Sequence, residues 1–343
     1  MSSSHPTIRD VARLAGVSHQ TVSRVINGSE DVTAETRERV EAAITELDYH
    51  PNAIARSMAR GETHTLACIS PNLTDYTFAS IIEGAELEAR NQGYFLLSSS
   101  ASDPESFKAL IEELVGHRRV DGLIIINPYA DGRHNYIPED FPLVFVGAYS
   151  RDGSICSVSL DDVQVAFDAT QHLLSLGHQK IAMITGPMEE DCSCDRVEGY
   201  RRAMLEAGLT IDETMTIEGD WTATSGQVAA QTLIERGHKP TAIFAQNDRM
   251  AMGVLRAARE MDLNVPSDLA VIGVDDMPLS SYFDPPLTTM RQDMPRIGQE
   301  ATRILLDIIQ KNEQLHCTVR LPAELVIRQS TVITGQQGGD QPS

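Results

Sequence analysis

The sequence has few cysteines and no long apolar segment. Its 343 residues include five cysteines, an odd number spread widely along the chain (Cys68, Cys156, Cys192, Cys194 and Cys317). This pattern argues against a disulfide framework and for a reducing compartment. The longest apolar run, near residues 123–126, is far shorter than the ~18 residues that a membrane-spanning helix needs. Residues 1–10 contain no apolar stretch typical of a secretory signal, so we expect a cytoplasmic protein with no membrane contact.

The sequence also lacks the motifs of the common nucleotide-dependent, metal-dependent and covalent enzymes. No Gly-x-Gly-x-x-Gly follows a predicted strand, and no phosphate-binding loop, His-Glu-x-x-His helix or Gly-x-Ser-x-Gly elbow is present. Cys192 and Cys194 form a Cys-x-Cys without a second Cys/His pair at metal spacing. We therefore expect no cofactor, no metal and no enzymatic activity.

Positive charge is scarce, because 28 Lys and Arg residues stand against 49 Asp and Glu residues, a formal net charge of −21. Taken alone, this balance excludes a nucleic-acid binder, since such domains are usually basic. The charge is unevenly distributed, however. Residues 1–64 hold seven Arg and nine acidic residues, a net charge of −2, which leaves −19 for the remaining residues. The amino-terminal part is therefore nearly neutral, and the acidic excess belongs to the long second part.

Residues 1–48 have the apolar spacing of three short helices. Apolar residues of the first helix recur at i, i+3, i+4 and i+7 (Ile8, Val11, Ala12 and Ala15). After a turn at Gly16, Ser18 is a good amino-terminal cap for the second helix, as Thr33 is for the third. Two helices joined by a tight glycine-containing turn and braced by a third form a helix-turn-helix. A generic three-helix bundle remains the alternative on spacing alone.

From residue 64 onward, apolar runs alternate with amphipathic stretches. The expected strands are 65–70, 94–98, 122–126, 143–146, 180–185, 241–245 and 269–274. Helices expected between them include 81–91, 106–115, 163–176, 198–207, 225–235 and 250–261. Near-continuous apolar runs are typical of parallel strands that are buried on both faces. The pattern predicts an α/β body with doubly wound parallel sheets, a class that binds ligands at the carboxyl ends of the strands.

A short segment connects the two parts. Pro51 ends the third helix, and residues 52–60 are compatible with a short helix before Gly61. Such a helix is below the ~12–15 residues that are usually stable alone, so it would need a partner to form. Arg56 and Arg60 would share one face, where they could contact phosphates. A plain linker is the alternative.

Several stretches of the sequence resemble the LacI/GalR transcription regulators. Residues 8–27, IRDVARLAGVSHQTVSRVIN, resemble the helix-turn-helix of that family, and residues 51–58, PNAIARSM, resemble its hinge helix. Further similar stretches are 177–187, 196–200, 247–248, 273–276 and 286–289, so that the resemblance spans roughly residues 6–331.

The resemblance implies a dimeric repressor with a two-lobed body like that of periplasmic sugar-binding proteins. The helix-turn-helix head would comprise residues 1–50, the hinge helix or linker 51–63, and the ligand-binding and dimerisation domain 64–335. Within that domain, an N-terminal lobe would comprise 64–161 and 292–322, and a C-terminal lobe 162–291 and 323–335. The tail, 336–343, has no leucine heptad and is expected to be disordered, which favours a dimer over a tetramer.

By the same resemblance, the second helix would enter the major groove and read base edges with His19, Gln20 and Arg24. Gln pairs well with adenine and Arg with guanine. Polar residues that would contact the DNA backbone are Thr7, Ser18, Thr21, Ser23, Asn27, Thr33, Tyr49 and Asn52, although each hydroxyl could equally cap a helix. The hinge adds Ala55 and Met58, and Met58 stands where the family generally has a leucine wedge between base steps.

Residues that match the family's ligand positions are Tyr76, Phe78, Asp161, Arg196, Trp221, Asn247 and Asp275. Trp221, the only tryptophan, could stack on the C–H face of a sugar, while the polar members offer donors and acceptors for vicinal hydroxyls. Alternatively, Trp221 fills the core or an interface, and Arg196 or Asp275 forms an internal ion pair. Glu190 occupies a loop position where purine-binding relatives have a basic residue, so an acid there disfavours purines and phosphorylated ligands. We expect a mono- or disaccharide, more readily an inducer than a corepressor.

Two other functions would share the two-lobed body, a cytoplasmic sugar-binding receptor and a sugar enzyme. A solute receptor predicts a signal peptide and no helix-turn-helix, and an enzyme requires a catalytic constellation; the sequence meets neither expectation. It therefore favours a homodimeric repressor of a pseudopalindromic double-stranded DNA operator.

Overall fold

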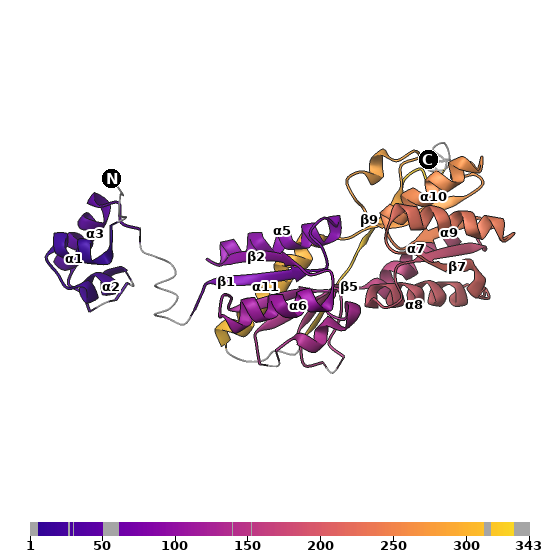
Figure 1. Cartoon of the computed structure of the whole chain (residues 1–343). Helices are drawn as coiled ribbons and strands as arrows, with labels where there is room; N and C mark the ends of the chain where they lie inside the picture. The colour runs from indigo at the N-terminus through magenta and orange to yellow at the C-terminus, as the bar shows by residue number, and fades with distance from the viewer. Residues whose placement is uncertain are drawn as a thin grey trace, which may run out of the picture. The chain divides into compact units, whose positions relative to one another are not determined.

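The computed structural model describes residues 6–26, 28–29, 31–50, 62–138, 140–151, 153–311 and 317–332. The chain forms two compact units, Met1–Thr63 and His64–Ser343 (Figure 1). Most of the predicted hinge and the whole predicted tail lie outside the described residues, as do Asn27, Asn52, Ala55 and Met58. Among the described helices, none is long and apolar enough to cross a membrane.

The first unit consists of three helices around a small apolar core. They are α1 (Ile8–Ala15), α2 (His19–Ile26) and α3 (Ala34–Glu46). Gly16, at a φ of 64°, makes the turn between the first two. The Ser18 hydroxyl accepts the Thr21 N–H at 3.1 Å and so caps α2, and Thr33 caps α3 through the Thr36 N–H at 3.4 Å. The core residues are Val11, Ala12, Ala15, Val22, Val25, Val40 and Ala43.

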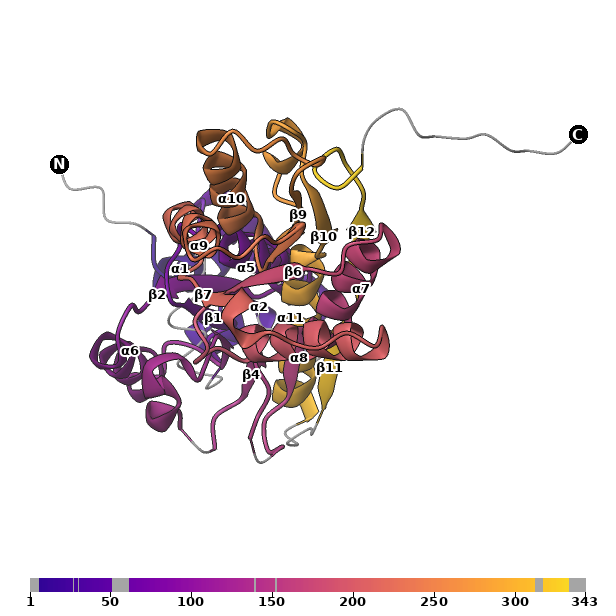
Figure 2. The ribbon, with the colours of Figure 1, turned by 90° about the vertical axis from the view of Figure 1, so that its right-hand side faces the viewer.

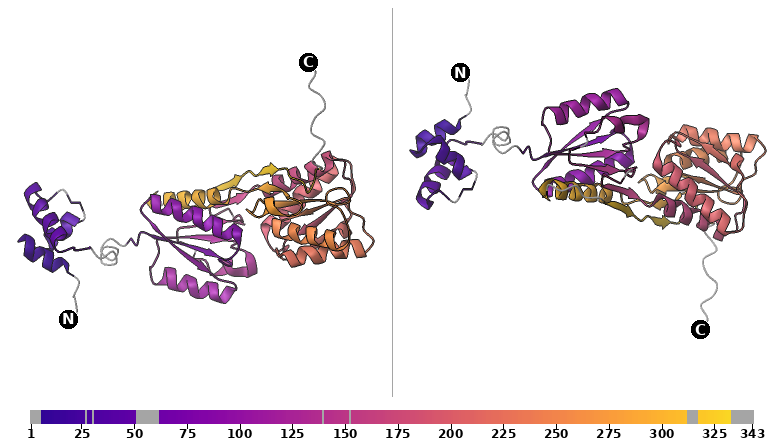
Figure 3. Two further views of the ribbon diagram at one scale, coloured as in Figure 1. Left: turned by 90° about the horizontal axis from the view of Figure 1, so that it is seen from above. Right: turned by 90° about the horizontal axis from the view of Figure 1, so that it is seen from below.

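The second unit contains two six-stranded sheets, and the first of these defines the N-lobe. Its strand order is β11-β5-β4-β3-β1-β2, and every pair is parallel. The strands are β1 (Thr65–Ser70), β2 (Phe95–Ser100), β3 (Gly122–Ile126), β4 (Leu143–Val146), β5 (Ser157–Leu160) and β11 (Thr318–Leu321). Helices α5 (Tyr76–Asn91) and α11 (Met294–Lys311) cover one face, and α6 (Pro104–Ile111) with the π-helix η1 (Glu112–Gly116) covers the other (Figure 3). The 3₁₀ helix η2 (Ala130–Tyr136) follows β3.

The second sheet defines the C-lobe and has the order β12-β10-β9-β8-β6-β7. Its strands are β6 (Ile181–Thr185), β7 (Thr216–Glu218), β8 (Ala242–Ala245), β9 (Ala270–Asp275), β10 (Thr288–Arg291) and β12 (Glu324–Val326), of which β12 alone is antiparallel to its neighbour. Helices α7 (Asp162–Ser175) and α8 (Asp191–Glu206) pack on one face, α9 (Ala223–Glu235) and α10 (Asp248–Glu260) on the other (Figure 2). Two 3₁₀ turns, η3 (Glu213–Met215) and η4 (Ser280–Tyr282), complete the lobe.

The chain passes between the lobes three times. It leaves the N-lobe sheet after β5, returns to it after β10 to form α11, and leaves it again after β11. These crossings lie next to the lobe limits expected from the sequence, at 161, 291 and 322. The doubly wound α/β class is confirmed, while the exact domain limits stay a prediction.

The expectation that the cysteines form no disulfide is wrong, because Cys156 and Cys317 are joined by one. They stand immediately before β5 and β11, which are paired in the register Ser157 to Thr318. The Ser157 N–H donates to the Cys317 carbonyl at 2.9 Å, and the two Cα atoms are 4.6 Å apart. The two cysteines are 161 residues apart in the sequence. Their proximity could not be predicted because β11 was not recognised as a strand of the same sheet as β5.

Candidate functional site

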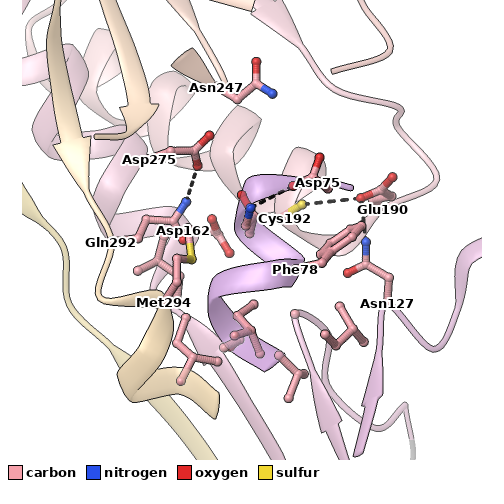
Figure 4. Close-up of a pocket in the computed structure, with 18 of the residues that line it drawn as sticks. Asp75, Phe78, Asn127, Asp162, Glu190, Cys192, Asn247, Asp275, Gln292 and Met294 are labelled. Atoms are coloured by element: carbon pink, nitrogen blue, oxygen red, sulfur yellow. Dashed lines mark hydrogen bonds between the residues drawn. The ribbon is translucent and has the colours of Figure 1, made fainter. Parts of the chain in front are cut away.

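A cleft of about 680 Å³ lies between the two lobes, at the carboxyl ends of their strands. Asn127 follows β3 and Gly147 follows β4 on the N-lobe side, while Asp275 ends β9 and Gln292 follows β10 on the C-lobe side. Figure 4 shows Asn127, Asp275 and Gln292 among the side chains that line this cleft. The cleft has the position that ligand sites take in doubly wound proteins.

The N-lobe contributes the apolar part of the cleft. Its aliphatic side chains come from the ends of three strands and from the two helices that cover the sheet. They are joined by one aromatic ring from the first turn of α5. The residues are Phe78, Ile81, Ile126, Val146, Leu160, Met294 and Ile297.

A buried ion pair forms the base of the polar part. The Arg196 guanidinium on α8 donates from Nε to Asp162 Oδ1 at 2.7 Å and from Nη1 to the Gln246 carbonyl. Both side chains are almost fully buried. Burial raises the pKa of Asp162, and the charge of Arg196 opposes this shift. Burial is the largest single effect and would lower the pKa of Arg196, but the charges of Asp162 and other nearby groups, together with the hydrogen bond to Asp162, raise that pKa overall. The ion pair predicted as an alternative role for Arg196 is thus present, and the same guanidinium also lines the cleft.

Trp221 forms one wall, and its ring is held from three sides. The indole N–H donates to Glu190 Oε1 at 3.1 Å, and the Arg196 guanidinium lies 5.9 Å from the ring centroid. The ring packs on the backbone of Gly186, where any Cβ would overlap it. Asn127 Nδ2 donates to the other oxygen of Glu190 at 3.1 Å. Burial raises the pKa of Glu190, while the hydrogen bond from Trp221 opposes that shift.

Asp275 and Asn247 also line the cleft from the C-lobe, and Asn247 lies beside Trp221. One carboxylate oxygen of Asp275 accepts from Gln292 Nε2 at 2.7 Å. Burial, then the nearby charge of Asp248, raises the pKa of Asp275 well above its ordinary value. The Asn247 side chain caps α10 by accepting the Met250 N–H at 2.8 Å, and its amide donates to the Trp221 carbonyl at 3.1 Å.

Three polar contacts join the lobes around the cleft. Arg249 on α10 donates to Asp75, the cap of α5, and Asn127 reaches Glu190 across the lobes. Outside the cleft lining, Arg151 forms a bidentate salt bridge with Asp191, in which Nη1 donates to Oδ2 at 3.0 Å and Nη2 to Oδ1 at 2.6 Å. Among the described lining residues, both arginines therefore have carboxylate partners. Four acidic residues (Asp75, Asp162, Glu190 and Asp275) surround these two cations.

The structure brings five of the seven predicted ligand residues to the cleft. These are Phe78, Arg196, Trp221, Asn247 and Asp275. The other two, Tyr76 and Asp161, are not among the described residues that line the cleft. Tyr76 is a partly exposed residue in the first turn of α5, and Asp161 caps α7 by accepting the Gln164 N–H at 3.3 Å. Asp162, the next residue, lines the cleft instead.

Sequence reasoning did not assign Asn127, Asp162, Arg249 and Gln292 to the site. Asn127 and Gln292 each directly follow a strand, which is a usable signal because parallel strands end at the same edge. β10 was not predicted, however, so Gln292 carried no such signal. Arg249 lies on an amphipathic helix, where a charged residue is ordinarily solvated.

The first unit presents a second candidate surface on α2. His19, Gln20 and Arg24 are exposed, and Gln20 and Arg24 are one helical turn apart. Thr21, Ser23 and Tyr49 are partly buried, whereas Thr7, Ser18 and Thr33 are exposed at helix starts. Ser18 and Thr33 cap helices, and Thr7 donates its N–H and hydroxyl to Asp10 at 2.9 and 2.7 Å. The capping alternative therefore holds for the hydroxyls of Ser18 and Thr33, and phosphate contact stays a prediction for all of these residues.

Two family models match the chain. Residues 7–52 match the model described as bacterial regulatory proteins, lacI family, and residues 170–331 match the periplasmic binding protein-like domain. Catabolite control protein A of Priestia megaterium is 38% identical over 95% of this chain and 99% of its own length. The transcriptional repressor CytR of Escherichia coli K12 is 34% identical over 95% of this chain and 96% of its own length.

Solved structures agree with these matches. A lac repressor dimer bound to operator and the anti-inducer ONPF has a TM-score of 0.85 at 33% identity, with 96% of this chain and 100% of that chain covered. A complex of the transcriptional regulator CelR with cellobiose has a TM-score of 0.75 at 33% identity, with 95% and 99% covered.

Proposed function

The chain belongs to the LacI family of DNA-binding transcriptional repressors, and we propose that the effector controlling it is a neutral mono- or disaccharide. The main observation in favour of a neutral ligand is the set of charged side chains that line the cleft. Its two arginines are each paired with a carboxylate, and acidic residues outnumber the arginines. An anionic ligand would have to break these pairs and meet the remaining acids. A polyhydroxyl ligand can use the same groups as donors and acceptors.

Two further features support a sugar. Trp221 offers a flat apolar face on which a pyranose C–H face can stack, and Asp275 with Gln292 offers an acceptor and a donor in the same cleft. The similar regulator CelR has been solved with cellobiose. We propose that Phe78, Arg196, Trp221, Asn247 and Asp275 contact the ligand, together with Asn127 and Gln292.

For the DNA side, we propose that α2 enters the major groove. His19, Gln20 and Arg24 would read bases, because the exposed residues of the first turns of a recognition helix face the base edges. Backbone contacts would come from Thr7, Ser18, Thr21, Ser23, Thr33 and Tyr49, with Asn27, Asn52, Ala55 and Met58 added from outside the described residues. A cytoplasmic location follows for a protein that binds the chromosome.

We propose that the protein acts as a homodimer, which would match a pseudopalindromic operator. β2 is the edge strand of the N-lobe sheet, and two of its apolar side chains are exposed, Phe95 to 77% and Leu97 to 41%. An open, apolar sheet edge of this kind is stable when another surface covers it. The saccharide would shift the balance between lobe arrangements and so release the operator.

Trp221 makes the ligand class directly testable, because no other tryptophan contributes to the fluorescence. The full-length protein is titrated with neutral mono- and disaccharides, sugar phosphates, purine bases and nucleosides. We expect at least one neutral saccharide to change the emission and to weaken binding to an operator selected from random DNA. A response to a sugar phosphate, purine or nucleoside, with none to any saccharide, would refute the ligand class. Arg196→Met, which removes the guanidinium beside the ring, should abolish the saccharide response.

A further inference from the structure

Asp248 is a fully buried carboxylate just outside the cleft lining. It is the first residue of α10, and its oxygens accept three hydrogen bonds. Oδ2 accepts from the Met277 N–H at 3.0 Å and the Ser280 hydroxyl at 2.5 Å, and Oδ1 accepts from the Thr289 hydroxyl at 2.6 Å. The carboxylate thus joins α10 to the loop after β9 and to β10.

The loop after β9 adopts a backbone conformation that requires such support. Asp275 has a φ of 127° and Asp276 a φ of 53°, two consecutive non-glycine residues in a region that side chains disfavour. Strain of this kind persists only where surrounding contacts hold it. The Thr289 hydroxyl, which donates to Asp248, also accepts the Asp276 N–H at 3.3 Å. Asp248 therefore holds Met277 directly and Asp276 through Thr289.

The chain neighbours of Asp248 make this support relevant to the ligand. Asn247 and Arg249 both line the cleft, as does Asp275 at the start of the loop. We propose that Asp248 is a positioning residue that sets the location of Asp275 relative to Asn247, and thereby the affinity of the cleft for its saccharide. This inference rests on the proposed function for its ligand, but its structural part can be tested without any ligand.

A carboxylate suits these contacts, because it accepts from all three partners. An amide would accept on one side only, and its NH₂ group would pair with the Thr289 hydroxyl only if that hydroxyl accepted instead of donating. Space is also limited, because Gly273 lies against Oδ1 and a Cβ there would overlap it. Burial raises the pKa of Asp248 to about 6, although the hydrogen bonds from Ser280, Thr289 and Met277 oppose the shift. Burial therefore disfavours the charged form of this carboxyl group, and the three hydrogen bonds favour it.

The first test is hydrogen exchange of the full-length Asp248→Asn variant, followed by mass spectrometry. We expect peptides covering residues 275–282 to exchange about tenfold faster, with the remainder of the C-lobe unchanged. Asp103→Asn, which alters a carboxylate cap of α6 in the N-lobe, is the matched control and should leave these peptides unchanged. Unaltered exchange at 275–282, or acceleration throughout the C-lobe, would overturn the positioning role.

The second test uses the neutral saccharide that gives the largest Trp221 response in the wild-type panel. Asp248→Asn should weaken its binding by about tenfold while operator affinity without saccharide stays unchanged. Ser280→Ala and Thr289→Val each remove one donor, and should weaken binding in the wild-type background but not in Asp248→Asn. Additive losses, or unchanged saccharide affinity despite a loosened loop, would contradict the proposal. If no saccharide binds the wild type, the ligand class fails, and the exchange experiment still decides whether Asp248 holds the loop.

Discussion

At the scale of single residues, acidic side chains crowd the start of α8. Asp195 lies near Asp161, Asp162 and Asp191, and Arg320 is the nearby cation. Burial, followed by the charge of Asp162, raises the pKa of Asp195 to about 6. The folded protein therefore holds a proton on this carboxyl group at a pH where the unfolded chain has released it.

This shift gives a pH-dependent stability prediction. Because the folded pKa exceeds the ordinary 3.8, the ionised form of Asp195 destabilises the fold, and the contribution of this residue to the free energy of unfolding falls as the pH rises between about 4 and 6. Asp195→Asn should raise the free energy of unfolding by roughly 1 kcal/mol at about pH 8, after allowance for screening of a half-buried group. The gain should vanish near pH 4. Denaturant titrations at both pH values check it, with the exposed Glu235→Gln as control. An equal gain at both values would contradict the prediction.

At the scale of elements, the sequence predicts most of the helices and strands that have a strong apolar period, although the expected helices do not include α11 (Met294–Lys311). The seven expected strands correspond to β1, β2, β3, β4, β6, β8 and β9, with small shifts at the ends. It does not predict β5, β7, β10, β11 and β12, which have three or four residues each. Ser157 and Ser159 of β5 are buried although they are polar. Pairing with neighbouring strands far along the chain, and not a local pattern, determines such strands.

The same contrast applies to the cleft. Trp221, Arg196 and Asp275 could be predicted because family motifs contain them. Asn127 directly follows a predicted strand, a signal that was present but not used. Gln292 could not be predicted, since β10 was not expected and its role depends on which strands end side by side in space. The disulfide between Cys156 and Cys317 was missed for the same reason.

Helix α2 carries a prediction about DNA sequence discrimination. Gln20 is exposed in the first turn, so its amide should pair with a base edge. Gln20→Ala should remove about 1–3 kcal/mol of discrimination at one position of each half-site, with nonspecific affinity unchanged because no phosphate contact is lost. Fluorescence anisotropy on single-base variants of the selected operator measures this, and Thr45→Ala on the exposed side of α3 is the control. A uniform loss over all sequences would show a backbone contact instead.

At the scale of the whole molecule, the distribution of charge constrains how the repressor binds DNA. Residues 1–64 have a net charge of −2 and the remaining residues −19. Bulk attraction to phosphates is therefore weak, and nonspecific binding should be modest. Affinity must come instead from two heads that are held together on two half-sites, which multiplies the effective concentration of the second head.

This reasoning makes dimerisation the main determinant of operator affinity, and the open edge of the N-lobe sheet provides the test. Phe95→Glu places a charge on β2 where the side chain is 77% exposed in the single chain. In the free chain the change should be tolerated, but in a dimer it would bury an unpaired carboxylate. We expect sedimentation velocity to show a monomer, operator affinity to fall by about a hundredfold or more, and the Trp221 response to saccharide to persist. Leu205→Glu, at a 60% exposed position on α8, is the matched control and should change none of these. A Phe95→Glu protein that remains dimeric would exclude β2 from the interface, and a monomer with full operator affinity would refute the dependence on dimeric geometry.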